Sequence, residues 1–158
     1  MIKVKVTGLS GVIRNLNKLL KTVDVGLDKA LAESSVLIKE AAIPLTPIYT
    51  GNLRNSSYVV IAGKGEVSRH ARAYAHATSR EIANFERVRA MAIQGATARL
   101  GSSTRNKISE VGFGAEYALK VHEAVGTTFR VGGPKFLENT VQAIKPQIIG
   151  KIVSVIKL

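Results

Sequence analysis

The pattern of apolar and polar positions predicts a strand followed by helices in the first third of the chain. Residues 2–6 alternate branched aliphatic residues with lysines, and this period of two is typical of a half-buried strand. Apolar residues then recur at spacings of three and four, which predicts helices over 10–21 and 25–43. Asp24 is expected to cap the second helix, with Gly26 as a weak point near its start.

A turn and a hairpin are predicted after these helices. Pro44 and Pro47 are expected to end the second helix, because a proline lacks the backbone donor and pushes the preceding residue out of the α region. Turn-forming residues follow, and Gly51, directly after Thr50, is expected at positive φ. Two further β-type segments, 57–63 and 106–113, are expected to pair with each other.

The segment between these two strands, 64–105, is predicted to be an insertion at the tip of the hairpin. Its apolar residues recur at helical spacing and predict an amphipathic helix over about 80–99. Over 64–107 there are nine basic residues, seven of them arginines, against three acidic ones. Half of the net charge of the chain therefore falls in this stretch.

The last third of the chain gives weaker signals. Residues 116–124 fit either a short helix or a short strand. Pro134 is expected at the first position of a final helix, where its missing N–H costs nothing. Helix and strand compete over 148–156 because the residues there are mostly β-branched, and Pro146 is expected to kink a helix.

These elements predict one α+β domain spanning residues 1–158. A small antiparallel sheet is expected to be packed by two or three helices, and the basic, largely helical insertion 64–105 is expected to project from this body. The expected strands are 2–6, 57–63 and 106–113, and the expected helices are 10–21, 25–43 and 134–156.

Composition supports a globular protein and removes several classes of function. Hydrophobic residues make up 46% of the 158 residues and charged residues 22%, which argues against a disordered polymer. The absence of cysteine excludes disulfide scaffolds, thiol nucleophiles and iron–sulfur sites. The longest uncharged run, 41–53, is too short and too rich in proline to cross a bilayer, and the N-terminus does not resemble a secretory signal.

The charge points to an anionic partner without saying which. A formal net charge of +12 attracts nucleic acid, anionic lipid or an acidic protein surface. Aromatic residues are scarce and tryptophan is absent, which disfavours a base-stacking platform for single strands. The basic insertion is equally compatible with a solvated helix face that only keeps the protein soluble.

Candidate catalytic chemistry is sparse. The three histidines, His70, His76 and His122, lack the four-residue spacing of a helical metal pair, so neither a metal nor another cofactor is expected. Ser10 lies in the short segment Gly8-Leu9-Ser10-Gly11. This segment is not a nucleophile elbow, because that motif needs glycine two residues after the serine, and Val12 stands there. The eleven carboxylates form no close pair suited to acid–base work. An enzyme is therefore the least supported class.

Three segments in order carry a resemblance to a known family. They are Pro-Ile-Tyr-Thr-Gly-Asn-Leu-Arg-Asn-Ser at 47–56, Tyr-Ala-Leu-Lys-Val-His-Glu at 117–123 and Gly-Pro-Lys-Phe-Leu-Glu at 133–138. Together they resemble the neck family of tailed bacteriophages, also called minor capsid, head-to-tail joining or tail completion proteins. The matching residues, expected to serve mainly the fold, are Pro47, Thr50, Gly51, Leu53, Arg54, Tyr117, Ala118, His122, Glu123, Pro134, Phe136 and Leu137.

The resemblance implies a structural virion protein without catalysis. Such a protein is made in the host cytoplasm and forms a homo-oligomeric ring, with six copies expected, at the interface of head and tail. Its expected partners are the connector or head-closure proteins and the tail terminator or tube proteins, around a channel in which DNA could be contacted without sequence preference; no membrane is expected. The rival hypothesis is a stand-alone basic protein that binds nucleic acid without sequence specificity. Candidate contacts to DNA or a partner are Arg69, Arg72, Arg80, Arg87 and Arg89.

Overall fold

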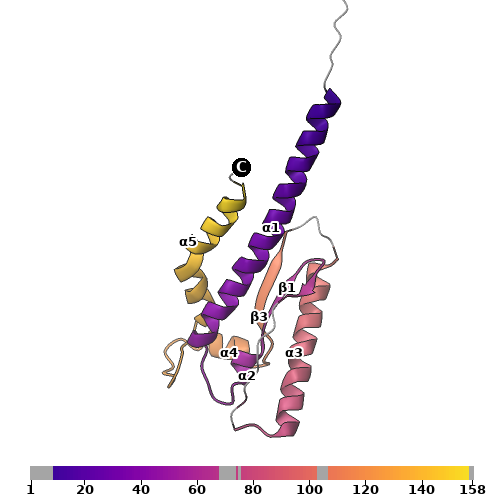
Figure 1. Cartoon of the computed structure of the whole chain (residues 1–158). Coiled ribbons are helices and arrows are strands. Elements are labelled where there is room, and N and C mark those ends of the chain that lie inside the picture. The colour runs from indigo at the N-terminus through magenta and orange to yellow at the C-terminus, as the bar shows by residue number, and fades with distance from the viewer. Residues whose placement is uncertain (1–8, 68–73, 75, 103–106, 157–158) are drawn as a thin grey trace, which may run out of the picture.

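The computed structural model describes residues 9–67, 74, 76–102 and 107–156 (Figure 1). Helices and strands are mixed in it, which confirms the α+β class. The predicted strand at 2–6 lies outside the described residues. In chain order the elements are α1 (Leu9–Leu45), α2 (Asn52–Asn55), β1 (Ser57–Ile61), β2 (Gly65–Glu66), α3 (Ser79–Leu100), β3 (Ser109–Phe113), α4 (Ala118–His122) and α5 (Phe136–Ile156).

The sheet has three antiparallel strands in the order β2-β1-β3. Strand β1 pairs with β3 so that Val59 lies opposite Val111, as expected for a hairpin of 57–63 and 106–113. On its other edge, Val60 lies opposite Glu66 of the short strand β2. The third described strand therefore comes from the beginning of the segment predicted as an insertion.

Helix α1 corrects the expectation of two helices, because its 37 residues run without a break (Figure 1). Asp24 does not act as a cap. Its carboxylate forms an ion pair with Lys107 Nζ at 2.8 Å. Gly26 lies inside the helix at a place where α5 comes close, since a Cβ built there would lie 2.3 Å from Cγ1 of Val155. The small residue serves helix packing rather than a helix start.

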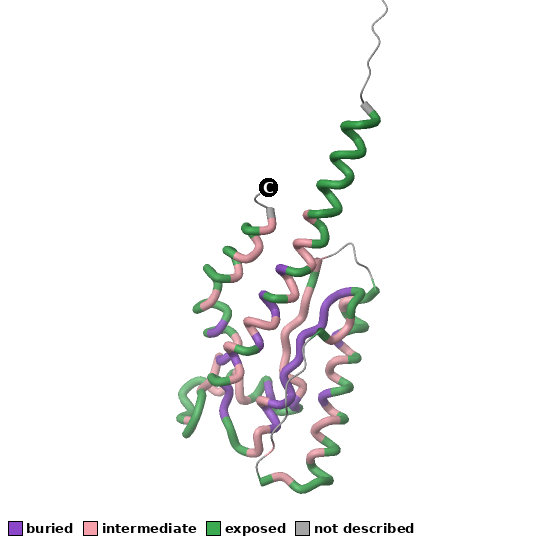
Figure 2. The backbone as a smooth tube through the Cα atoms, viewed as in Figure 1, coloured by how far each residue is buried: buried purple, intermediate pink, exposed green. Residues whose placement is uncertain are grey.

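Helix α3 matches the predicted amphipathic helix and has a complete capping box formed by Thr78 and Glu81. The insertion was expected to project from the body, and this expectation was wrong for α3, which lies against the sheet. Its buried Ala96 packs against Tyr58 and Val60 of β1, so α3 covers one face of the sheet. Helix α1 contacts β1 and β3, and α5 packs along α1, giving layers in which all five residues of β1 are buried (Figures 1 and 2).

The final helix begins two residues later than predicted. Pro134 and Lys135 form a turn, with Lys135 at a φ of 54°, and α5 starts at Phe136. The Lys135 N–H donates to the carbonyl of His122 at 2.7 Å, which ties the start of α5 to α4. Residues 148–156, where helix and strand competed, are helical. The described helices include none that is both long and apolar enough to span a membrane.

Candidate interaction surfaces

The three segments that carry the family resemblance meet at one end of the molecule, where α1 ends. Arg54 of the first segment donates from Nε to the carbonyl of Thr46 at 3.1 Å and from Nη2 to that of Pro44 at 3.0 Å. These carbonyls lie within the last turn of α1 and directly after it, where no further helical turn follows to satisfy them. Gly51 has a φ of 81°, which confirms the expected left-handed turn.

The loop before α5 closes on the same helix end. The Gly133 N–H donates to the Leu45 carbonyl at 3.0 Å. At Gly132, whose φ is 74°, an added Cβ would lie 2.5 Å from the Leu45 oxygen. The loop before α5 is therefore held against the end of α1, and at Gly132 the close approach leaves no room for a side chain.

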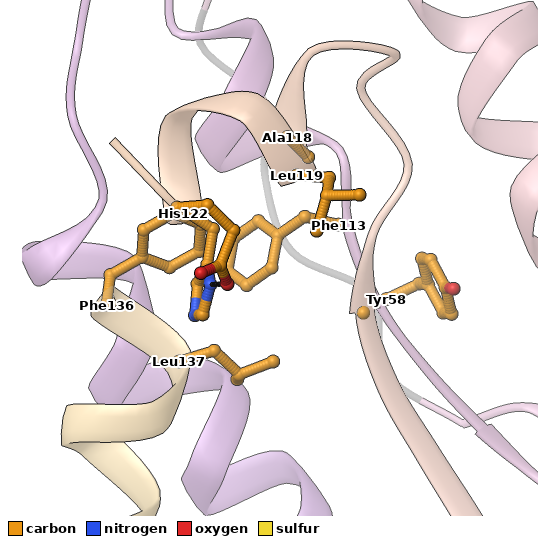
Figure 3. Close-up of a pocket in the computed structure, with 9 residues that line it drawn as sticks. Tyr58, Phe113, Ala118, Leu119, His122, Phe136 and Leu137 are labelled. Carbon is orange, nitrogen blue, oxygen red and sulfur yellow. Dashed lines mark hydrogen bonds and ion pairs between the residues drawn. The ribbon is translucent and has the colours of Figure 1, made fainter. Parts of the chain in front are cut away.

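Aromatic and aliphatic side chains from all three segments form the core of this junction. Leu53, Ala118 and Phe136 are buried in one cluster. The ring of Phe136 meets Phe113 edge-on, with centroids 5.0 Å apart, and meets His122 edge-on at 4.9 Å. Figure 3 shows these three rings gathered together, with Tyr58 lying apart from them. The motif residues in this cluster contribute to packing.

A polar chain lies along the rim of the junction. His122 Nδ1 lies 2.8 Å from Glu123 Oε1, and Glu123 also pairs with Lys135. The Lys135 ammonium, helped by the hydrogen bond with His122, lowers the pKa of the Glu123 carboxyl below its usual value. The other ring nitrogen of His122, Nε2, is buried without a hydrogen-bond partner among the described residues. This rim fixes α4 to the start of α5.

An open pocket of about 390 Å³ lies beside this cluster. Its walls are mainly apolar and include Phe113, Leu119 and Leu137, with Glu123 at the edge. Leu119 is 73% exposed, and Tyr117 of the same motif is also exposed. This surface is suited to contact with an apolar side chain of another protein.

Arg89 corrects the expectation that it contacts DNA or a partner. The residue is 4% exposed. Its guanidinium donates from Nε and Nη2 to the Ser57 carbonyl at 3.3 and 3.2 Å and forms an ion pair with Glu66. Arg89 therefore fastens α3 to β1 and β2.

Lys39 is a second buried cation, and the sequence analysis did not identify it. It is 1% exposed within α1, and burial lowers the pKa of its ammonium. Helical spacing was a usable signal, because Lys39 falls on the same side of the helix as Ser35 and Ala42, which are also buried. It contributes to the inside of the fold, not to the basic surface.

The other candidate arginines remain on the surface where they are described. Arg80 and Arg87 are exposed on α3, seven residues and about two turns apart. Arg87 donates a hydrogen bond to Asn84 Oδ1 at 2.9 Å. Because the asparagine amide is neutral, this contact does not neutralise the charge of the guanidinium. Arg69 and Arg72 lie outside the described residues. Of the five candidate arginines, Arg80 and Arg87 are thus the two that the structure describes as exposed.

Many acidic side chains are paired within the chain. Asp28 pairs with Lys107 at 2.8 Å and with Lys64 at 3.1 Å, and these two ammonium groups lower the pKa of its carboxyl. Glu110 pairs with Arg99 at 2.5 Å. Because these acids are occupied internally, the excess cations are left for solvent or for a partner.

The N-terminal half of α1 projects beyond the other described elements (Figures 1 and 2). Every residue over 10–22 is exposed. This projecting segment, defined here as residues 10–25, has large apolar side chains on its surface: Val12, Ile13, Leu16, Leu19, Leu20 and Val25.

The described residues contain no group of three histidine or carboxylate side chains that could hold a metal ion. Comparison of the chain with protein-family models, with curated proteins and with solved structures found no match.

Proposed function

We propose that the protein is a structural subunit of a tailed bacteriophage neck, where it joins the head to the tail as part of a ring around the DNA channel. The observation that supports this best is the convergence of the three motif segments. Sixty residues separate segment 47–56 from 117–123, and nine separate 117–123 from 133–138, yet matching side chains of all three share one junction. A resemblance scattered over unrelated parts of the surface would carry less weight.

The described surfaces support an assembly role. Apolar side chains are exposed on the projecting segment of α1 and in the pocket beside Leu119. Exposed apolar surface of this kind often marks a site of contact with another protein. The internal pairing of acids such as Asp28 leaves a basic exterior suited to acidic neighbours. In this proposal the protein acts in the virion, at the interface of head and tail, without catalysis.

Loss of the protein in its phage tests this proposal directly. A nonsense mutation in the gene should leave DNA-filled heads and complete tails that fail to join, and a plasmid copy should restore joining. Electron microscopy of the particles then measures the joined fraction. Purified necks that lack this chain, or that hold it without rotational symmetry, would contradict the proposal.

The second candidate is a stand-alone protein that binds nucleic acid without sequence preference. The exposed cations Arg80 and Arg87, together with the net charge of +12, favour it. Native mass spectrometry with and without duplex DNA separates the two functions. A monomer or dimer that binds DNA tightly supports this candidate, whereas a closed ring supports the neck protein.

A further inference from the structure

The projecting segment continues an apolar stripe that is covered lower down on the same helix. Apolar or small residues follow one another at spacings of three and four from Ile13 through Leu20 to Leu27 and Ala30. Ala30 is 3% exposed, whereas Leu20 is 58% exposed. Cover by α5 reaches as far up as Gly26, which contacts Val155. The stripe is therefore built for helix packing along its length, and its upper half lacks a described neighbour.

The charges of the projecting segment restrict what can cover it. Arg14, Lys18 and Lys21 flank the apolar stripe, and residues 10–23 contain no acid. Two copies of this segment packed against each other would bring these cations together, which opposes symmetric pairing. The segment also lacks the aromatic residues that anchor helices in a lipid interface. A suitable cover is therefore an apolar groove with acidic edges.

Such a groove lies on the body of this protein, between α1 and α5. Its apolar lining residues are Ala32, Val36 and Leu37, and its charged ones are Glu33, Glu40 and Lys151. The Glu33 carboxylate forms an ion pair with Lys151 Nζ at 3.2 Å. Glu40 is exposed and makes no ion pair with another described side chain. The groove thus offers apolar contact beside the exposed carboxylate of Glu40, whose charge also acts on the buried ammonium of Lys39.

The projecting segment cannot reach this groove within one chain. Both belong to the continuous helix α1, and Asn17 and Ala32 are separated along it by about 22 Å at 1.5 Å per residue. We propose that the projecting segment of one copy docks in the groove between α1 and α5 of a second copy. Each copy then gives one helix and receives one.

This contact joins two different surfaces, so it can repeat from copy to copy and close into a ring. Ring closure around the channel rests on the proposed neck function, whereas the contact itself does not. Lys18 and Lys21 of one copy would lie beside Glu40 of the next, and the leucines of the segment would lie along Val36 and Leu37.

Cross-linking between single-cysteine variants tests the contact, because the chain has no cysteine of its own. Asn17→Cys marks the segment and Ala32→Cys marks the groove. The two variants are mixed and treated with a bismaleimide whose spacer is short compared with the helix. We expect mixed dimers to predominate, at least five-fold over Asn17→Cys paired with Gln94→Cys, an exposed position on α3.

Charge reversal supplies the specific control. Adding Lys18→Glu to the segment variant, or Glu40→Lys to the groove variant, should lower the mixed cross-link several-fold. Combining the two reversed partners should restore it, since the charges are then exchanged rather than removed. Circular dichroism of each variant verifies that the helices are retained. A yield that ignores both reversals, or a pair that fails to recover, overturns the proposal.

Other occupants give other results, each of which overturns the proposal. Asn17→Cys cross-linked mainly to itself means that two projecting segments pair with each other. If the mixed cross-link is absent and the protein binds vesicles of anionic phospholipid in a way that depends on Leu16, the segment lies on a membrane. If both the mixed cross-link and vesicle binding are absent, a different protein covers the segment.

The test separates this contact from the neck function. If the cross-link forms and Leu16→Asp abolishes it, but a nonsense mutation in the gene leaves head-to-tail joining intact, the contact holds and the proposed function fails. If necks contain the chain as a symmetric ring but no mixed cross-link forms, the function holds and this contact fails.

Discussion

Arg87 and Arg89 lie on the same helix, two residues apart, and have opposite roles. Arg87 is exposed, whereas Arg89 is buried against the Ser57 carbonyl and Glu66. Their positions in the sequence did not separate them, because residues two apart on a helix point in different directions and the buried direction depends on the sheet beneath. The acidic partner, Glu66, comes from a two-residue strand that the sequence pattern did not reveal.

Removing the Arg89 guanidinium should destabilise the fold strongly. We expect Arg89→Met to lower the free energy of unfolding by about 3 kcal/mol, because Glu66 and a buried carbonyl lose their partner. Arg87→Met is the matched control and should change it by less than about 0.5 kcal/mol. Urea unfolding followed by circular dichroism measures both. Equal effects of the two substitutions would contradict the buried role of Arg89.

Adjacent glycines should also differ in their tolerance of a methyl group. Gly132→Ala should cost about 3 kcal/mol, because it combines a left-handed φ of 74° with a Cβ 2.5 Å from the Leu45 oxygen. Gly133→Ala meets no atom within 4 Å and should cost less than about 1 kcal/mol. The free energy of unfolding in urea compares them. A Gly132→Ala protein as stable as the wild type would show that the loop does not close on α1.

Tyr58 should titrate later than an ordinary tyrosine. Burial, and the hydrogen bond that its hydroxyl donates to Glu110 at 2.8 Å, raise its pKa to about 12. Its contribution to stability is therefore complete below about pH 10, the usual value, and is lost as the pH rises through 12. Absorbance at the phenolate band should show a tyrosine ionisation step near pH 12. In Tyr58→Phe that late step should be missing.

At the scale of elements, helical and strand periodicity predicted the framework well. The amphipathic helix expected over 80–99 is α3, Ser79–Leu100, and the strand pair is β1 with β3. The junction of motif residues was available only through the resemblance, because contacts such as that of Arg54 with the end of α1 join segments whose separate patterns carry no distance information. The free groove between α1 and α5 had no sequence signal for the same reason.

The break expected near Gly26 shows why tertiary contacts matter. Asp24 and Gly26 are ordinary helix-start signals, but both are used between elements, one toward Lys107 and the other toward Val155. A weak helix former is tolerated inside a helix when packing compensates for it. The same reasoning applies to Pro134, where a loop constraint at Lys135 delays the helix.

Close approach of α1 and α5 gives an element-scale prediction. Gly26→Ala should destabilise the protein by about 1–3 kcal/mol, since its Cβ would overlap Val155 even though alanine favours a helix. Val155→Ala alone removes a half-buried side chain, and the double substitution should be more stable than the sum of the single effects predicts. Additive effects in urea unfolding would mean that the two residues do not touch.

At the scale of the whole molecule, acidic and basic side chains have different roles. Acidic groups such as Asp28 and Glu110 hold elements together, while Arg80 and Arg87 on α3 and the cations of the projecting segment form no ion pair with a described acidic side chain. A net charge of +12 thus becomes a basic exterior around a body held together in part by ion pairs. This arrangement suits association with acidic neighbours, and it also suits DNA, so the two must be separated by experiment.

Reversal of the α3 arginines distinguishes these partners. We expect Arg80→Glu with Arg87→Glu to block head-to-tail joining while changing the free energy of unfolding by less than about 0.5 kcal/mol, because both side chains are exposed. Arg89 is left intact, since its reversal would unfold the protein. Joining is scored by electron microscopy and stability by urea unfolding. Lys145→Glu, an exposed reversal on α5, is the control for net charge.

DNA binding by the same variants completes the comparison. A partner role predicts weak DNA affinity for the free protein, because a channel lining that gripped DNA would impede its passage. If the arginines contact phosphates instead, affinity should fall steeply with salt, and the double reversal should reduce the logarithmic slope by about 1.8, at 0.9 per phosphate. Such a change with joining intact would favour the nucleic-acid-binding function. Normal joining together with unchanged DNA affinity would mean that Arg80 and Arg87 belong to a solvated helix face, and the docking surfaces would then lie at the junction and along α1.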